Sequence, residues 1–128
     1  MEISLKDPER IFLVGKDNNI QIKHAADITL LANEQITFLS SDNREYDIVK
    51  KEWGYYASPS INGRLKSFGF RSFLVSNNQN KLYLMCVDSD MMNEFRSYCK
   101  DEGQKVVLEL TDWNLVSDEL GQLLPAKK

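Results

Sequence analysis

The chain has 128 residues, a net charge of −3 and 42% apolar residues. This length predicts one domain, and it is enough to bury a core without metal or disulfide staples. The apolar content argues against a disordered chain, and the slight acidity argues against a domain-wide surface for DNA or RNA. We therefore expect a single compact domain over residues 1–128 with no nucleic-acid partner.

The sequence contains neither a membrane-span pattern nor an export pattern. No apolar run approaches the roughly 18 residues of a spanning helix. The first residues, Met-Glu-Ile-Ser-Leu-Lys-Asp-Pro, lack the basic and apolar stretches of a secretory leader. Cys86 and Cys99 are not spaced as a redox pair, and we expect both to be reduced and buried. These features predict a cytoplasmic protein without a membrane partner.

Short apolar runs separated by turn formers fill the first part of the chain. Their alternation predicts strands at 10–14, 20–23, 28–31, 35–39 and 46–50. The following segment, 53–64, mixes aromatic, glycine, proline and small polar residues without a period. We expect an ordered loop there, and loops of this length are often functional.

The clearest predicted element is a hairpin of strands 68–76 and 81–87, joined by Asn77-Asn78-Gln79-Asn80. Residues 82–87 are apolar throughout, which is typical of a central strand buried on both faces.

Helical spacing appears only after this hairpin. Asp88 offers an N-cap for a helix that Gly103 should end, and Asp112 or its neighbour Thr111 could cap a last short helix after a strand at 106–110. The tail, 125–128, should fray. Strands first and helices late predict an α+β fold: a strand-rich, curved, mixed or antiparallel sheet with two helices in the C-terminal third.

The residues that most enzymes use are sparse. His24 is the only histidine, so the multi-histidine metal sites of many enzymes are excluded, and we expect it to be a hydrogen-bonded residue at a strand end. No glycine-rich phosphate motif and no Gly-x-Ser-x-Gly elbow occurs. Asp88 and Asp90 open a helix, where acids ordinarily cap and favour the dipole. We predict no catalytic residue, no metal and no cofactor.

Segment 53–71 differs from the rest of the chain in charge and composition. From Arg44 to Arg71 six bases face three acids, a net charge of about +3. From Asp88 to Glu119 three bases face nine acids, a net charge of about −6. Arginine suits carboxylate or phosphate, aromatic rings stack on sugars or bases, and a backbone nest could form near Gly63. The candidate ligand-binding residues are Trp53, Tyr55, Tyr56, Ser58, Ser60, Asn62, Arg64, Lys66 and Arg71.

The same residues also fit two other interpretations. The aromatic side chains could be core residues where the chain crosses between sheets, with Arg64 and Lys66 either solvated or paired with the acidic helix face. Exposed Tyr, Trp and Arg are also typical anchors of protein interfaces, and the split of charge would allow a homodimer.

The stretch Trp-Gly-Tyr-Tyr-Ala-Ser-Pro-Ser-Ile-Asn-Gly-Arg-Leu at 53–65 resembles small bacterial proteins that accompany surface-polysaccharide biosynthesis genes. Phe-Gly-Phe-Arg at 68–71 and the strand at 83–87 are similar as well, so the likeness covers about the middle half of the chain. The resemblance implies an accessory or binding role near sugar nucleotides, and it identifies no catalytic residue.

We therefore expect a non-enzymatic binding or accessory module that holds an anionic small molecule, such as a sugar nucleotide, or a protein partner through segment 53–71. One alternative is a small enzyme acting on a sugar-nucleotide-type substrate, for which His24 would have to reach that segment. The other is a structural, oligomerising protein.

Overall fold

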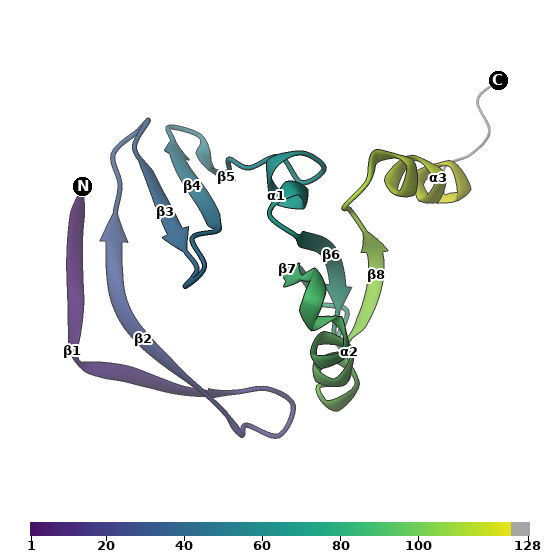
Figure 1. Ribbon diagram of the computed structural model, residues 1–128. Coiled ribbons are helices and arrows are strands. Elements are labelled where there is room, and N and C mark those ends of the chain that lie inside the picture. Colours follow the sequence, from purple (N-terminus) through teal and green to yellow (C-terminus); the bar gives the residue numbers. More distant parts are fainter. Residues whose placement is uncertain (124–128) are drawn as a thin grey trace. The chain divides into compact units, whose positions relative to one another are not determined.

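The computed structural model describes residues 1–123 and has the predicted α+β class (Figure 1). Within these residues, eight strands form three sheets, and every strand pair is antiparallel. The predicted fold class and the two helices of the C-terminal third are thus confirmed. The strands are divided among three sheets, whereas the sequence suggested one.

The chain packs as two compact units, residues 1–58 (unit 1) and the residues from Pro59 onward (unit 2). The first two sheets belong to unit 1, and the third sheet belongs to unit 2 with all the helices of the described residues. The single domain over residues 1–128 stays a prediction.

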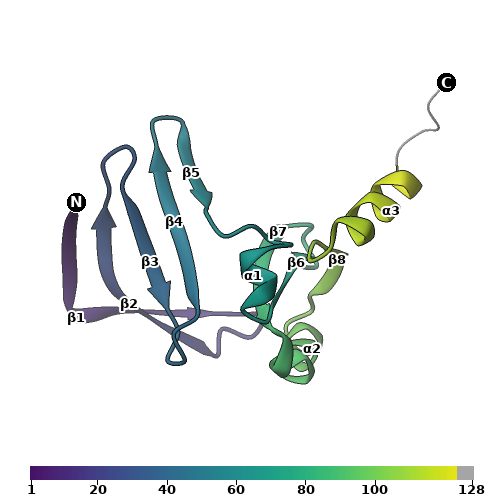
Figure 2. The same ribbon diagram turned by 45° about the horizontal axis from the view of Figure 1, so that its top comes forward.

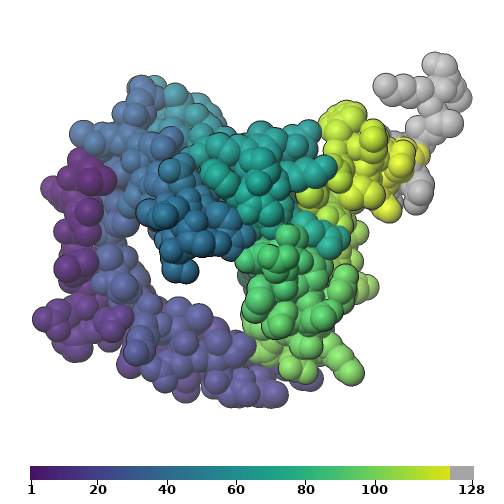
Figure 3. Space-filling model, viewed as in Figure 1, coloured from purple at the N-terminus to yellow at the C-terminus, as the bar shows by residue number. Residues whose placement is uncertain are grey.

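Unit 1 consists of a long hairpin and a three-stranded meander, which are drawn as ribbons in Figure 2 and as space-filling atoms in Figure 3. Residues 2–5 pair with 26–29 beyond a register shift between Leu5 and Arg10, so the first strand is longer than its apolar run at 10–14 suggested. The predicted strands at 20–23 and 28–31 fall largely in one strand. The elements are β1 (Glu2–Val14), β2 (Ile20–Thr29), β3 (Gln35–Leu39), β4 (Glu45–Lys51) and β5 (Gly54–Ala57).

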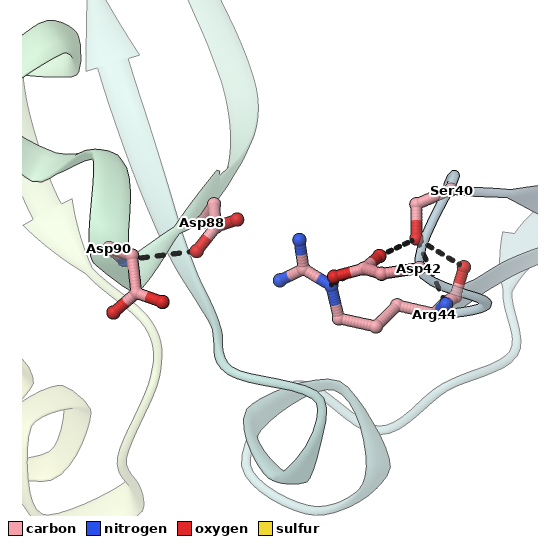
Figure 4. A network of polar contacts seen from close by, with 5 residues as sticks. All are labelled: Ser40, Asp42, Arg44, Asp88 and Asp90. Atoms are coloured by element: carbon pink, nitrogen blue, oxygen red, sulfur yellow. Dashed lines mark hydrogen bonds and ion pairs between the residues drawn. The ribbon is translucent and has the colours of Figure 1, made fainter.

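Asparagine shapes the predicted turns. Asn18, Asn43 and Asn80 have φ values of 53°, 66° and 60°, in the left-handed region that asparagine tolerates better than most side chains. The turn between β3 and β4 is further fixed by Ser40, whose hydroxyl contacts Asp42 and accepts the Arg44 N–H at 2.9 Å (Figure 4). These turns are where the sequence predicted them.

Unit 2 is built on a three-stranded sheet with the order β7-β6-β8. The predicted hairpin is confirmed as β6 and β7. The prediction that 82–87 is a central strand is wrong, because β6 pairs with both neighbours and β7 is left at the edge. The elements are α1 (Arg64–Ser67), β6 (Phe70–Ser76), β7 (Leu82–Asp88), the 3₁₀ turn η1 (Ser89–Met91), α2 (Met92–Asp101), β8 (Lys105–Glu109) and α3 (Trp113–Leu123).

One face of this sheet carries the core of unit 2. Phe73, Val75 and Val87 form a buried cluster, against which Met85, Met92 and Phe95 pack. Cys99 is buried as predicted. Cys86 is exposed, contrary to prediction, because it alternates with Met85 and Val87 onto the other face of the strand.

The predicted helix-end signals are confirmed in part, because α2 itself begins after Met91 without a side-chain cap. The Asp88 side chain accepts the Asp90 N–H at 2.9 Å and caps η1, as Figure 4 shows. Gly103 follows α2 with φ 64°, which suits glycine. The predicted fraying at 125–128 lies outside the described residues. Along residues 1–123, no helix combines the length and apolarity that a membrane crossing requires.

Candidate functional site

The structure divides the predicted site residues between the two units at Ser58. Trp53, Tyr55 and Tyr56 belong to unit 1 with Ser58, and the remaining candidates belong to unit 2. The predicted loop at 53–64 is therefore wrong in part. Residues 54–57 pair with β4 as strand β5, and a turn of helix begins at Arg64. A strand of four residues is too short to show an alternating period, so the sequence pattern did not reveal β5. Tyrosine favours strands, and this was the available signal.

In unit 1, the candidate aromatics are exposed. The rings of Trp53 and Tyr56 stack with centroids 6.1 Å apart and an interplanar angle of 17°. Trp53 is 71% exposed. The Lys50 ammonium lies 5.0 Å from the centre of the Tyr55 ring. The stacked pair offers a flat apolar surface to a ring or to a partner protein.

Ser58 and Ser60 have roles in the backbone path. The Ser58 N–H donates to the Asp47 carbonyl at 2.9 Å, which continues the β4–β5 pairing. Ser60 Oγ accepts the Arg64 N–H at 3.2 Å at the start of α1.

Gly63 closes the same turn. A Cβ on Gly63 would collide with the Ser60 hydroxyl, and the Gly63 N–H donates to the Ser60 carbonyl at 3.2 Å. Asn62 is exposed and Arg64 half-buried. The N–H groups of this turn donate to Ser60, so the backbone nest expected near Gly63 is occupied within the protein.

Two of the predicted residues, Lys66 and Arg71, meet at one pocket that lies wholly in unit 2. The pocket holds about 370 Å³ and is formed by α1, β6, the end of β8 and the start of α3. Its lining residues are Lys66, Gly69, Phe70, Arg71, Ser89, Glu109, Thr111, Asp112 and Leu115.

Each base of the pocket faces an acid. Arg71 donates to both carboxylate oxygens of Glu109, at 2.9 and 2.7 Å, in a bidentate pair. Thr111 donates to the same carboxylate at 2.7 Å and accepts the Ser72 N–H at 3.1 Å. Lys66 pairs with Asp112, and these side chains are 49% and 44% exposed. Arg71 is therefore fixed, whereas Lys66 can exchange its partner.

Sequence reasoning missed the acidic half of this pocket. Glu109, Thr111 and Asp112 were not candidates, although the acidic stretch 88–119 and the suggested pairing of bases with it were the available signal. The pair of Lys66 with Asp112 matches that suggestion only in part, because Asp112 lies in a loop and not on a helix. The pair of Arg71 with Glu109 was not suggested.

Arg71 also sets the acid behaviour of Glu109. The hydrogen bond from Arg71, with help from Thr111, lowers the pKa of Glu109 below its usual 4.5. Because the pKa of Glu109 is lower in the folded than in the unfolded chain, this carboxylate stabilises the fold at pH values above its unfolded pKa. The stabilisation is lost as the pH falls through the pKa of the folded state.

We expect the difference in unfolding free energy between wild type and Glu109→Gln to be constant near pH 7 and to shrink below about pH 4.5. Urea unfolding at several pH values measures this difference. Asp27, Glu34 and Asp42 also have lowered pKa values and remain in both proteins, so their contributions cancel. A difference that stays constant down to pH 3 would contradict the assignment.

His24 lies inside β2 and is hydrogen-bonded, though it is not at the strand end that we expected. Its Nε2 lies 3.1 Å from the Ala26 carbonyl and 2.8 Å from Asp27 Oδ1, both acceptors. Its ring lies near that of Phe12, and none of these partners belongs to segment 53–71. Among the described residues, no group of three or more His, Cys, Asp or Glu side chains could hold a metal.

The comparisons with known proteins found no matching family model, no matching curated protein and no matching solved structure. The function is therefore argued from the geometry of this chain.

Proposed function

We propose that this chain is a non-enzymatic binding module whose ligand is a small anionic molecule of the sugar-nucleotide class, held in the unit 2 pocket. The observation that supports the proposal is the meeting of Lys66 and Arg71 at one pocket of about 370 Å³. That volume is within the range of small-molecule sites.

The charges of the pocket favour a ligand that both accepts and donates hydrogen bonds. Lys66 and Asp112 form an exposed ion pair, which is worth only about 0–1 kcal/mol, so a phosphate can replace Asp112 as the partner of Lys66. The carboxylates of Asp112 and Glu109 can accept hydrogen bonds from the hydroxyl groups of a sugar. A bare anion would use only the basic half.

The apolar side of the pocket adds a surface for a ring. Phe70 and Leu115 are among its lining residues. Sugar and base rings bury apolar faces readily against such side chains. An accessory role in surface-polysaccharide biosynthesis is consistent with this ligand class.

Thermal unfolding with a panel of nucleotide sugars, nucleotides and inorganic phosphate tests the proposal. A ligand present at 100 times its dissociation constant should stabilise the protein by about 2.7 kcal/mol and raise Tm by several degrees. We expect the largest shift with a nucleotide sugar and a smaller one with phosphate.

The site is tested with Lys66→Ala, which should remove most of the shift, against Lys100→Ala as control. Lys100 is exposed on α2 and is not part of the pocket lining. If no compound of the panel raises Tm, the proposed ligand class is wrong. If the rise in Tm survives Lys66→Ala, the ligand does not bind at the proposed site.

A protein partner is the second candidate, and the exposed aromatics of unit 1 favour it. Trp53 and Tyr55 are 71% and 63% exposed. Tryptophan and tyrosine are the commonest anchors of protein interfaces. Trp53→Ala, with Glu52→Ala as the neighbouring exposed control, should weaken capture of such a partner without changing the ligand shift of unit 2.

A further inference from the structure

The β7 strand is an edge strand of its sheet. In the part of the chain that the structure describes, its only sheet neighbour is β6. Residues 82–87 contain no charge and no proline, and the pairing with β6 runs without a bulge. Leu82 and Leu84 are 60% and 57% exposed. Proteins usually block a sheet edge with charges, prolines or bulges, so an edge that lacks them indicates a strand-pairing surface.

The opposite edge of the same sheet is blocked in the usual ways. The β8 strand has five residues, begins with Lys105 and ends with Glu109. A register shift interrupts its pairing with β6 beside Val107. Bulges and charges of this kind prevent strand addition. The two edges therefore differ, and only β7 suits a further strand.

A groove runs beside β7, between this strand and α2. It holds about 350 Å³, and its walls include Met85, Val87, Met91 and Tyr98. Asp88 and Glu94 add acidic groups to its lining. A strand edge next to a helix groove is the usual receptor for an added β-strand, because the backbone pairs along the edge and alternate side chains enter the groove.

We propose that β7 pairs antiparallel with β7 of a second copy of this chain, making a two-fold dimer with a continuous six-stranded sheet. A two-fold axis perpendicular to the sheet keeps the same residues on the same face in both copies. Tyr83 and Met85 lie on the core face, opposite Val75 and Phe73. In the dimer these two side chains of each copy face the apolar groove of the other.

The charges at the strand ends select the antiparallel second copy. Lys81 precedes β7, and the acidic Glu94 lies in the groove beside this strand. Antiparallel pairing brings Lys81 of one copy toward Glu94 of the other, and it does so twice. Parallel pairing would set like charges together, which is unfavourable.

Light scattering of the full chain over a range of concentrations tests the dimer. We expect wild type to reach the mass of two chains and Leu84→Lys to stay at one, because a central charge on the edge opposes pairing. Val107→Lys, the same kind of change on the β8 edge at a residue that is 49% exposed, should dimerise like wild type. A monomeric wild type would overturn the proposal, and so would a dimer that only Val107→Lys disrupts.

A charge exchange tests the register independently of folding. Lys81→Glu and Glu94→Lys should each weaken the dimer by about tenfold or more, since each sets two like-charged pairs at the interface. Mixed together, the two variants should restore dimers of one chain of each kind. Failure of the mixture to dimerise would overturn antiparallel self-pairing. If wild type stays monomeric but captures an apolar extended peptide, the partner of β7 is such a peptide and the self-pairing proposal is wrong.

Discussion

Phe73→Ala is expected to lower the free energy of unfolding by about 3–5 kcal/mol. Phe73 is 4% exposed on the central strand β6 and belongs to the buried cluster of unit 2. Its ring stacks on Phe95 of α2 at 5.2 Å, so the truncation removes both buried area and the contact that joins sheet to helix. Arg71 also lies over this ring, at 5.3 Å.

Denaturant unfolding monitored by circular dichroism measures this loss. Trp113→Ala is the matched control, because it deletes an aromatic ring that is 67% exposed on α3. We expect that control to change the free energy of unfolding by no more than about 0.5 kcal/mol. Equal losses for the two variants would mean that Phe73 does not lie at the centre of the core.

The turns and the β6–β7 hairpin could be predicted because their signals are local. Asn18 and Asn43 take left-handed conformations that few side chains tolerate, so their positions mark turns whatever surrounds them. The place of β7 in its sheet could not be predicted in this way. An apolar run looks the same in a central strand and in an edge strand that awaits a partner, and only the pairing of β6 with β8 distinguishes them.

The basic residues of the site could be predicted from the sequence, but their ion-pair partners could not. Lys66 and Arg71 were chosen because bases suit anions, and both reach the unit 2 pocket. Their partners, Asp112 and Glu109, lie about 40 residues away along the chain and are brought near by the antiparallel register of β6 and β8. No local pattern encodes that register. Only the folded structure shows that the predicted bases are paired with acids in one pocket.

The position of Lys66 at this pocket depends on a helix that is too short to be stable in isolation. The α1 helix has four residues, far below the roughly 12–15 that an isolated helix needs in water. Its buried residue is Leu65, which is 2% exposed, between Arg64 and Lys66. Burial of this leucine, together with the hydrogen bonds to Ser60, holds both the helix and the base that the proposed ligand requires.

We accordingly expect Leu65→Ala to lower the free energy of unfolding by about 2–5 kcal/mol and to reduce the ligand-induced shift in Tm. Lys66→Ala on the same helix is the matched control: it should remove the ligand shift while leaving stability within about 1 kcal/mol of wild type, because the pair with Asp112 is exposed. Denaturant unfolding and thermal unfolding with ligand separate the two effects. Equal unfolding midpoints for the two variants would show that α1 is held by contacts other than Leu65.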